Sequence, residues 1–367
     1  MFRPLLLAAL IATQASASDD QNTSVHRAAD NIPDNTFKVV AIPFYDPSVS
    51  AGVSVVPIYA FHAGENTKSA STISATLTYT ENESYYFTGN TDLLLNNDKL
   101  RFVSEFGFRH TNLTLTDVLD ITGELDITEE TYYVIADVYN QIIPNLYAGL
   151  GVNYESTRFL NDFTDNDFKP DLGLRLSLLW DTRDHYYVPS SGFAWKITYE
   201  DHSSWLGNEE DASYSSISAD YRHFHSLNAS DNHVVALKVV GRYLLDKETA
   251  PKSALTTYGR QGKETQRGFE VGNYIGAHLV NSEIEYRYRI NNSGYEWLDK
   301  VSTVGFAGVG KVFDGPIGSF SEAETLSMVG VGLRYAIIPK ERINVRMDIT
   351  YSSDNEVLAY FSLGESI

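Results

Sequence analysis

The 367-residue sequence predicts an all-β fold, a transmembrane antiparallel β-barrel of sixteen strands. From residue 37 to the C-terminus, apolar and polar residues alternate with period two in segments of about ten residues. Successive side chains of a strand point to opposite faces, so each segment has one apolar and one polar face. The polar faces carry Arg, Glu, Lys and Asp more densely than the surface of a sandwich does, which favours a barrel with lipid outside and a wet lumen inside.

Two segments show the alternation clearly. In residues 283–290 the apolar positions are Ile284, Tyr286, Tyr288 and Ile290, and the polar ones are Glu283, Glu285, Arg287 and Arg289. In residues 343–352 we expect lipid-facing side chains at Ile343, Val345, Met347, Ile349 and Tyr351, and lumen-facing ones at Arg346 and Asp348. An arginine on the lipid face near the midplane costs about 2–4 kcal/mol, so the charged set should face inward.

Fifteen strands are clear, and single-chain bacterial barrels have an even number. The sixteenth is either residues 37–44 or residues 113–125, and we favour the first. Tyr and Trp recur near the strand ends, as aromatic girdles at the two membrane interfaces require. The fifteen strands lie near residues 51–62, 70–81, 84–95, 99–111, 130–141, 145–157, 171–181, 192–201, 212–225, 233–245, 275–290, 300–313, 326–337, 342–352 and 357–364.

The N-terminus predicts export. Arg3 precedes the apolar run 5–12, which leads into Ala15-Ser16-Ala17, and this pattern is typical of a secretory signal peptide over residues 1–17. The run is too short for a helical membrane span, which needs roughly 20 residues. Residues 18–36 are polar and predict a periplasmic linker without a stable fold, followed by the barrel over residues 37–367. The expected route is the general secretory pathway, and the expected destination is the Gram-negative outer membrane.

The composition limits the kinds of binding partner that we expect for this protein. The formal net charge of −20 disfavours nucleic acid, and the absence of cysteine excludes a disulfide framework. Outer-membrane lipid and lipopolysaccharide are the expected surroundings. No spacing of Ser, His and acid predicts a catalytic site, so we expect no enzyme, no cofactor and no metal. His223 and His225 share one strand face but would need a third metal ligand, and residues 161–167 lack the spacing of a calcium loop, so a solvated loop is favoured.

Four segments, in order, resemble the barrel of the BamA/TamA superfamily, also called the bacterial surface antigen family. The resemblance covers about residues 37 to 367 and is specific because all four segments occur on alternating strands. They are Ile42-Pro43-Phe44-Tyr45-Asp46-Pro47 with Gly52; Asp181-Thr182-Arg183-Asp184 with Pro189 and Gly192; Gln266-Arg267-Gly268-Phe269; and Asn344-Val345-Arg346-Met347-Asp348 through Tyr360-Phe361-Ser362-Leu363-Gly364-Glu365.

The resemblance implies a role for each segment. The sixth extracellular loop, with Arg267, Gly268 and Phe269, would fold into the lumen, and Arg267 would pair with Glu285 on the next strand. Asp181, Arg183, Pro189 and Gly192 would form a periplasmic turn, and Phe361, Leu363, Gly364 and Ile367 would form a C-terminal assembly signal.

This sequence departs from the family pattern at three places. Gly308 stands where the family has a second carboxylate, which suggests a simple Arg267–Glu285 pair or a looser loop. The linker has no room for a POTRA domain, and Ile367 replaces the usual terminal aromatic residue.

Three functions follow as alternatives. The first is a minimal factor in outer-membrane protein assembly or translocation, with periplasmic or outer-membrane protein partners. The second is a passive pore or a structural surface protein. The third is a lipid-active barrel enzyme, which would need a Ser or Asp within hydrogen-bond reach of a histidine near a membrane interface.

Overall fold

The computed structural model describes residues 35–46, 49–63, 69–116, 124–160, 167–248, 250–251, 254–259, 266–269, 274–291, 293–315 and 317–367. The expected signal peptide, nearly all of the expected linker and most of the 161–167 loop lie outside these ranges. Within the ranges that are described, no helix has the length and apolar character to cross a membrane.

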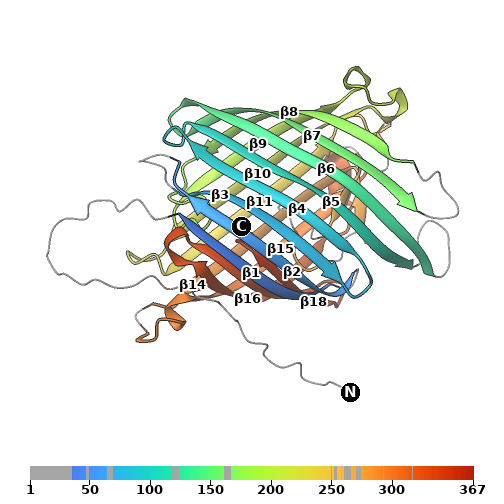
Figure 1. Cartoon of the computed structure of the whole chain (residues 1–367). Coiled ribbons are helices and arrows are strands. Elements are labelled where there is room, and N and C mark those ends of the chain that lie inside the picture. The colour runs from blue at the N-terminus through green and yellow to red at the C-terminus, as the bar shows by residue number, and fades with distance from the viewer. Residues whose placement is uncertain are drawn as a thin grey trace. The chain divides into compact units, whose positions relative to one another are not determined.

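Sixteen strands form one antiparallel sheet, as predicted, in a nearly closed barrel (Figure 1). Strand β1 (Thr36–Asp46) matches the favoured position of the sixteenth strand, whereas residues 113–116 extend β5. The others are β2 (Ser50–Phe61), β3 (Ser71–Thr80), β4 (Tyr85–Leu95), β5 (Leu100–Thr116), β6 (Glu124–Ile143), β7 (Leu146–Leu160), β8 (Lys169–Asp181), β9 (Gly192–His202), β10 (Tyr214–Ser226), β11 (His233–Leu244), β14 (His278–Arg289), β15 (Val301–Phe313), β16 (Leu326–Ile338), β17 (Ile343–Ser352) and β18 (Val357–Leu363).

Each strand pairs with its neighbour in the chain, with one exception. Strand β11 pairs with β14, because the connection between them holds a separate two-stranded sheet of β12 (Thr256–Tyr258) and β13 (Tyr274–Gly276). The period-two pattern did not predict these two short strands. The first and last strands, β1 and β18, lie side by side and complete the barrel wall.

The barrel is apolar outside and charged inside, the reverse of a soluble protein. On β14, Ile284 and Tyr286 are 51% and 42% exposed, whereas Glu283 and Glu285 are 1% and 0% exposed. On β17, Ile349 and Tyr351 are exposed while Arg346 and Asp348 are buried. Apolar side chains that keep this much exposure on a folded barrel form the face that meets lipid.

Ile343 corrects one expectation. It was predicted to face lipid, but it is buried and packs with Ile58, Ala60 and Ala70. The pairing of β16 with β17 is irregular between Ala336 and Ile338, and contacts with residues far earlier in the chain draw Ile343 inward, so it departs from the outward pattern of the rest of β17.

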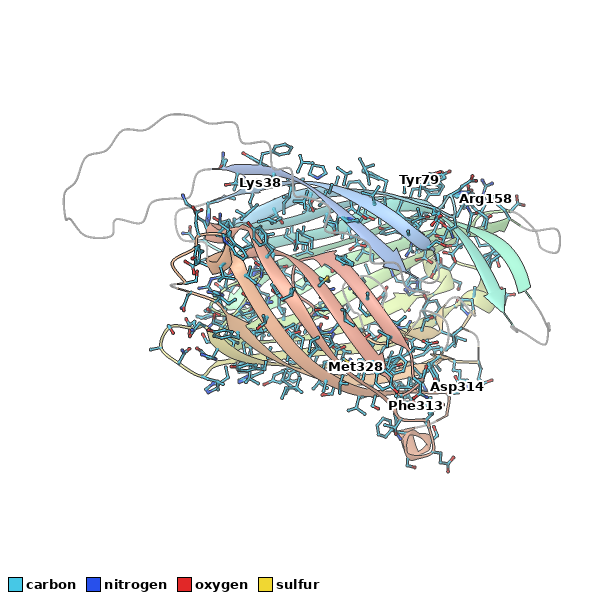
Figure 2. The ribbon with its side chains drawn as sticks, turned by 90° about the horizontal axis from the view of Figure 1, so that it is seen from below. Lys38, Tyr79, Arg158, Phe313, Asp314 and Met328 are labelled. Carbon is cyan, nitrogen blue, oxygen red and sulfur yellow. The ribbon has the colours of Figure 1, made fainter. Side chains whose placement is uncertain are left out.

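The antiparallel order divides the connections between the two ends of the barrel. Lys38 lies near one end, and Tyr79 and Arg158 lie near the other (Figure 2). We call the first the β8–β9 end, because it carries the connection 182–191 and the C-terminal residues 364–367. The connection that contains Arg267 belongs to the opposite end.

Candidate functional site

Arg267 lies against the inner wall of the barrel and is 1% exposed. Its guanidinium donates to Glu283 Oε2 from Nη2 (3.0 Å) and Nε (3.1 Å). Its Nη1 donates to Glu285 Oε2 at 2.9 Å and to Asp348 Oδ2 at 3.2 Å. The structure therefore brings Arg267 together with the carboxylate named from the sequence and with two more.

The strands explain why these carboxylates converge. Glu283 and Glu285 are two residues apart on β14 and so share its inner face. Asp348 comes from β17, which is separated from β14 by β15 and β16, and it reaches the same guanidinium from the side. A buried guanidinium needs several well-placed acceptors to offset its lost hydration, and this site supplies three.

Gly308 does not loosen the site, and the expected simple pair is corrected to a larger cluster. Gly308 is paired with Glu283 in the β14–β15 register. A Cβ atom at Gly308 would lie 2.9 Å from Glu283 Cγ and 2.7 Å from Met328 Cε. Glu283 thus occupies the space that a side chain on β15 would need. The ring of Phe306 then lies under the guanidinium, with Arg267 Cζ 3.5 Å from the ring centroid.

A second layer of cations surrounds the carboxylates. Arg334 bonds Asp348 at 2.6 Å and Glu365 at 2.7 Å. Arg287 bonds Glu285 at 2.8 Å and the carbonyl of Ile367 at 3.0 Å. Lys238 lies 3.4 Å from Glu283. The sequence alone does not identify these partners, although the alternation places Arg287 on the inner face of its strand.

Gly268 and Phe269 fix the backbone beside Arg267. Gly268 has φ +98°, a conformation that favours glycine, and a Cβ there would lie 2.7 Å from Met328 Cβ. Its N–H donates to the hydroxyl of Tyr360 on β18 at 2.9 Å. Phe269 is 1% exposed and meets the ring of Tyr258 edge-on at 5.2 Å. Much of the rest of the β11–β14 connection lies outside the described residues.

Ion pairs and charge-assisted hydrogen bonds stabilise the connection between β8 and β9. Asp181 bonds Arg183 at 2.9 Å and Arg101 of β5 at 2.6 Å. After Pro189, the backbone N–H groups of residues 190 and 191 donate to Asp184 Oδ1 at 2.8 and 3.0 Å. Gly192 has φ +90°, and a Cβ there would overlap the carbonyl of Thr182, so only glycine fits.

His185 lies at the centre of the same connection. Burial lowers its pKa from the ordinary 6.5 to about 4, and the nearby Arg342 acts in the same direction. Its Nδ1 accepts from the backbone N–H groups of Tyr187 and Val188, both at 3.2 Å. A protonated ring would lose both bonds, so the neutral form holds this turn together.

The C-terminal residues divide between the last strand and the lumen. Phe361 and Leu363 are strand residues of β18, opposite Met347 and Val345 of β17. The chain leaves the strand at Gly364, which has φ +80°. Ile367 is buried and packs with Phe224 and Ala236 on β10 and β11. The residues after β18 therefore cross to another part of the inner wall.

The two terminal strands form a seam. The ladder runs from β1 through to β18 in one linear order, and within the described part of the chain no ladder pairs β1 with β18. These two strands are nevertheless neighbours. The seam is the place where the barrel wall is closed without the continuous backbone pairing found everywhere else.

Comparison with known proteins agrees with this geometry. The Omp85 superfamily domain matches residues 44–366. The chain belongs to the Omp85 superfamily. This confirms the resemblance drawn from the four sequence segments, because BamA and TamA barrels are of this type. A search of curated proteins gave no match.

Solved Omp85-type barrels share the fold at low identity. The barrel of BamA from Haemophilus ducreyi lacking POTRA domains 1–3 is 13% identical, with a TM-score of 0.57, and the match covers 90% of this chain and 70% of that one. CdiB from Escherichia coli is 10% identical, with a TM-score of 0.62, covering 89% and 62%. CdiB from Acinetobacter baumannii is 12% identical, with a TM-score of 0.58, covering 89% and 59%. This Omp85 chain thus spans about three fifths of the CdiB chains.

His202 bears on the enzyme alternative, because an aspartate lies within hydrogen-bond reach of its ring. His202 is held by carboxylates on both ring nitrogens, Asp171 at 2.7 Å and Glu200 at 3.1 Å, which leaves neither nitrogen to activate a nucleophile. His223 and His225 lie on β10, where His223 meets the hydroxyl of Tyr221 at 3.3 Å. Among the residues that the structure describes, no group of three or more His, Asp or Glu side chains is placed to hold a metal ion.

Proposed function

We propose that this Omp85 barrel acts in protein assembly or translocation at the outer membrane, together with periplasmic or outer-membrane protein partners. The observation that carries the proposal is the seam between β1 and β18. A sheet edge without a ladder partner can pair with a strand of another chain, which is how an inserting or translocating polypeptide would be held. Membership of the Omp85 superfamily, whose barrels include BamA and CdiB, supports this role.

The Arg267 cluster would keep its part of the barrel wall in place while the seam opens. We infer that the sixth extracellular loop folds inward and that its Arg267, Gly268 and Phe269 anchor it to the lumen wall. Support comes from the three carboxylates around the guanidinium and from the bond between Gly268 and Tyr360 of β18. An anchor that joins β14, β17 and β18 would hold the wall next to the seam in place while β1 moves.

The remaining assignments complete the proposal. The β8–β9 end would face the periplasm, with Asp181, Arg183, Pro189 and Gly192 in a periplasmic turn. Residues 1–17 would be a signal peptide for the general secretory pathway, and residues 18–36 a periplasmic linker. Phe361, Leu363, Gly364 and Ile367 would act as the signal for the assembly of this barrel itself. The outer face would contact outer-membrane lipid and lipopolysaccharide.

The test is capture of the polypeptide in transit. A photo-crosslinking residue is placed at Phe37 on the outer face of β1, with Ile284 on β14 as a matched lipid-facing control. Crosslinked protein is purified from outer membranes, and the partners are identified by mass spectrometry. The proposal expects protein adducts at Phe37 but not at Ile284. Equal labelling at the two positions, or lipid adducts alone, would contradict it.

A passive pore is the second candidate, and one observation favours it. The lumen holds a cavity of about 630 Å³ whose lining includes Asp92, Arg101, Glu105 and Lys196. Charged walls of both signs can pass small ions. Conductance in a planar bilayer that is insensitive to deletion of the Arg267 loop would support the pore instead.

A further inference from the structure

Three connections meet at the β8–β9 end beside the seam. The first is represented by His62, Ser69 and Ala70, which flank the β2–β3 connection. The second is the segment 182–191 between β8 and β9. The third, between β16 and β17, is the short 3-10 helix η6 (Pro339–Glu341) followed by Arg342. Strands β2 and β3 lie on one side of the seam, and β16 and β17 lie on the other.

Glu341 bridges the seam directly. Its side chain is buried, with Oε1 3.2 Å from His62 Nε2 and Oε2 accepting from the Ala70 N–H at 3.3 Å. Both partners belong to the β2–β3 side. The bridge therefore passes over β1 and β18 and joins the strands behind them.

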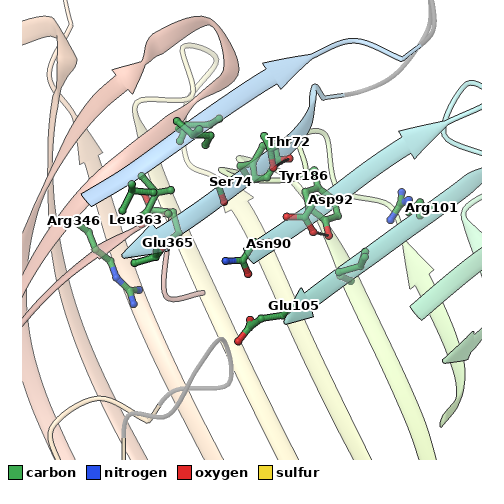
Figure 3. Close-up of a pocket in the computed structure, with 18 of the residues that line it drawn as sticks. Thr72, Ser74, Asn90, Asp92, Arg101, Glu105, Tyr186, Arg346, Leu363 and Glu365 are labelled. Atoms are coloured by element: carbon green, nitrogen blue, oxygen red, sulfur yellow. Dashed lines mark hydrogen bonds between the residues drawn. The ribbon is translucent and has the colours of Figure 1, made fainter. Parts of the chain in front are cut away.

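The segment 182–191 is hydrogen-bonded to the β2–β3 side of the seam through two tyrosines. The hydroxyl of Tyr187 donates to the carbonyl of Ala70 at 3.1 Å and contacts Thr72 Oγ1 at 3.0 Å. The N–H of Tyr186 donates to Ser69 Oγ at 2.8 Å. Tyr186 also points its hydroxyl at Asp92 of β4, 3.2 Å away (Figure 3).

The same segment is hydrogen-bonded to the β16–β17 side of the seam through Arg342. The guanidinium donates from Nη1 to the carbonyl of Val188 and to Ser190 Oγ, both at 3.3 Å, and lies 3.5 Å from Asp184. One connection, which starts from the far wall of the barrel, is thus bonded to both sides of the seam. It also lies over the lumen cavity, whose lining includes Arg183, Tyr186 and Tyr187.

An apolar cluster fills the space between these bonds. Ile58, Ala60 and Ala70 come from one side of the seam, and Ile338 and Ile343 come from the other, with Tyr187 packed against them. The inward turn of Ile343 belongs to this cluster. Ala70 belongs both to this cluster and to the bonds of Glu341, and a hydrogen bond in such buried, apolar surroundings is stronger than one in water.

We propose that Glu341, Arg342 and Tyr187, with these partners, form a clasp that closes the seam and the lumen at the β8–β9 end. Side chains of three connections do there what a strand ladder does elsewhere in the wall. Strands β1 and β18 part at this end only after the clasp releases. The consequence for a client polypeptide rests on the proposed function, but the closure itself does not.

The test is local hydrogen exchange of the whole barrel in lipid nanodiscs, read by mass spectrometry without any client. The variant is Glu341→Gln with Arg342→Gln, and Tyr187→Phe is a milder variant that removes only a hydroxyl. Glu296→Gln is the matched control, because Glu296 is exposed and pairs with Lys300 in another connection of the same end. We expect exchange on the order of ten-fold faster in β1, β2, β17 and β18 of the double variant, a smaller increase in Tyr187→Phe, and none in the control.

Two results would overturn the clasp. One is unchanged exchange on both sides of the seam in a folded double variant. The other is an equal increase in β5 to β7, which would mean that these residues stabilise the barrel as a whole. If the double variant does not fold, Tyr187→Phe decides by the same two criteria. Because no client is present, failure of the proposed function would leave this readout unchanged.

Discussion

Replacement of Glu285 by Gln tests the centre of the lumen cluster. Glu285 is 0% exposed and contacts three cations: Arg267 at 2.9 Å, Arg287 at 2.8 Å and Arg334 at 3.5 Å. The ion pairs of the cluster join four cations with four carboxylates, namely Arg267, Arg287, Arg334 and Lys238 with Glu283, Glu285, Asp348 and Glu365. The substitution keeps the shape of the side chain but leaves one buried positive charge in excess.

The magnitude follows from what each cation retains. Loss of one partner from a buried ion pair costs about 3–5 kcal/mol when the remaining charge has no other acceptor. Arg267 keeps Glu283 and Asp348 as acceptors, so its contribution to the loss is small, whereas Arg287 keeps the carbonyl of Ile367. The amide oxygen of Gln still accepts one bond. We therefore expect a loss of about 2 kcal/mol in the free energy of unfolding.

The assay has a global and a local readout. Unfolding by urea in detergent micelles gives the stability, and limited proteolysis maps new cleavage sites in residues 245–277. The matched control is Glu296→Gln, whose side chain is 89% exposed and should change stability by less than about 0.5 kcal/mol. Arg287→Gln added to Glu285→Gln restores the charge balance and should recover part of the loss, as a double-mutant cycle would measure.

The reasoning is refuted if Glu285→Gln matches the control in both readouts. It is also refuted if the second substitution adds its own loss in full, because a shared charge balance predicts coupling between the two positions.

Three further outcomes follow from the same structure. Gly268→Ala places a Cβ at positive φ and 2.7 Å from Met328, so we expect about 1–3 kcal/mol of destabilisation and new cleavage near residue 268, measured by the same two assays. The pKa of His185 is about 4 in the folded protein against 6.5 in the unfolded chain, so its contribution to the stability of the turn is complete above pH 6.5 and falls by up to about 3 kcal/mol as the pH drops to 4. Hydrogen exchange of residues 182–191 at pH 7 and pH 5 checks this. In the His185→Asn variant the exchange rate should not change between the two pH values for this reason. Gly308→Asp would crowd Glu283, so we expect a loss of about 1–3 kcal/mol in urea unfolding, and a gain would refute the packing argument.

Alternation predicted the strands because its cause is local. Lipid on one side and water on the other impose period two on every strand, and the positions of Glu285, Asp348 and Arg346 on the inner face follow from the sequence alone. The pattern failed at Ile343, where an irregular strand pairing and contacts with residues some 280 positions earlier in the chain decide the direction of the side chain. It also missed β12 and β13, which are too short to show a period.

The partners of Arg267 were only partly predictable, for a different reason. Glu285 came from a family resemblance, but Glu283 and Asp348 depend on the register of four adjacent strands, which sets which inward residues lie at the same height. The sequence showed that β15 carries glycine at position 308. It did not show that the space is filled from the neighbouring strand, because that requires the β14–β15 pairing of Gly308 with Glu283.

Taken with the seam, the register explains where the charges gather. Backbone hydrogen bonds already hold adjacent strands of the wall together, so side-chain bonds add most stability where they join strands that are not adjacent. The Arg267 cluster joins β14 to β17 and, through Glu365, to the residues after β18. Glu341 joins the β16–β17 connection to the β2–β3 connection. One set thus fixes the wall on the β18 side of the seam, and the other spans the seam at a single end. If β1 opens as proposed, the bonds of Glu341 across the seam must break, whereas the Arg267 cluster can stay intact on the β18 side.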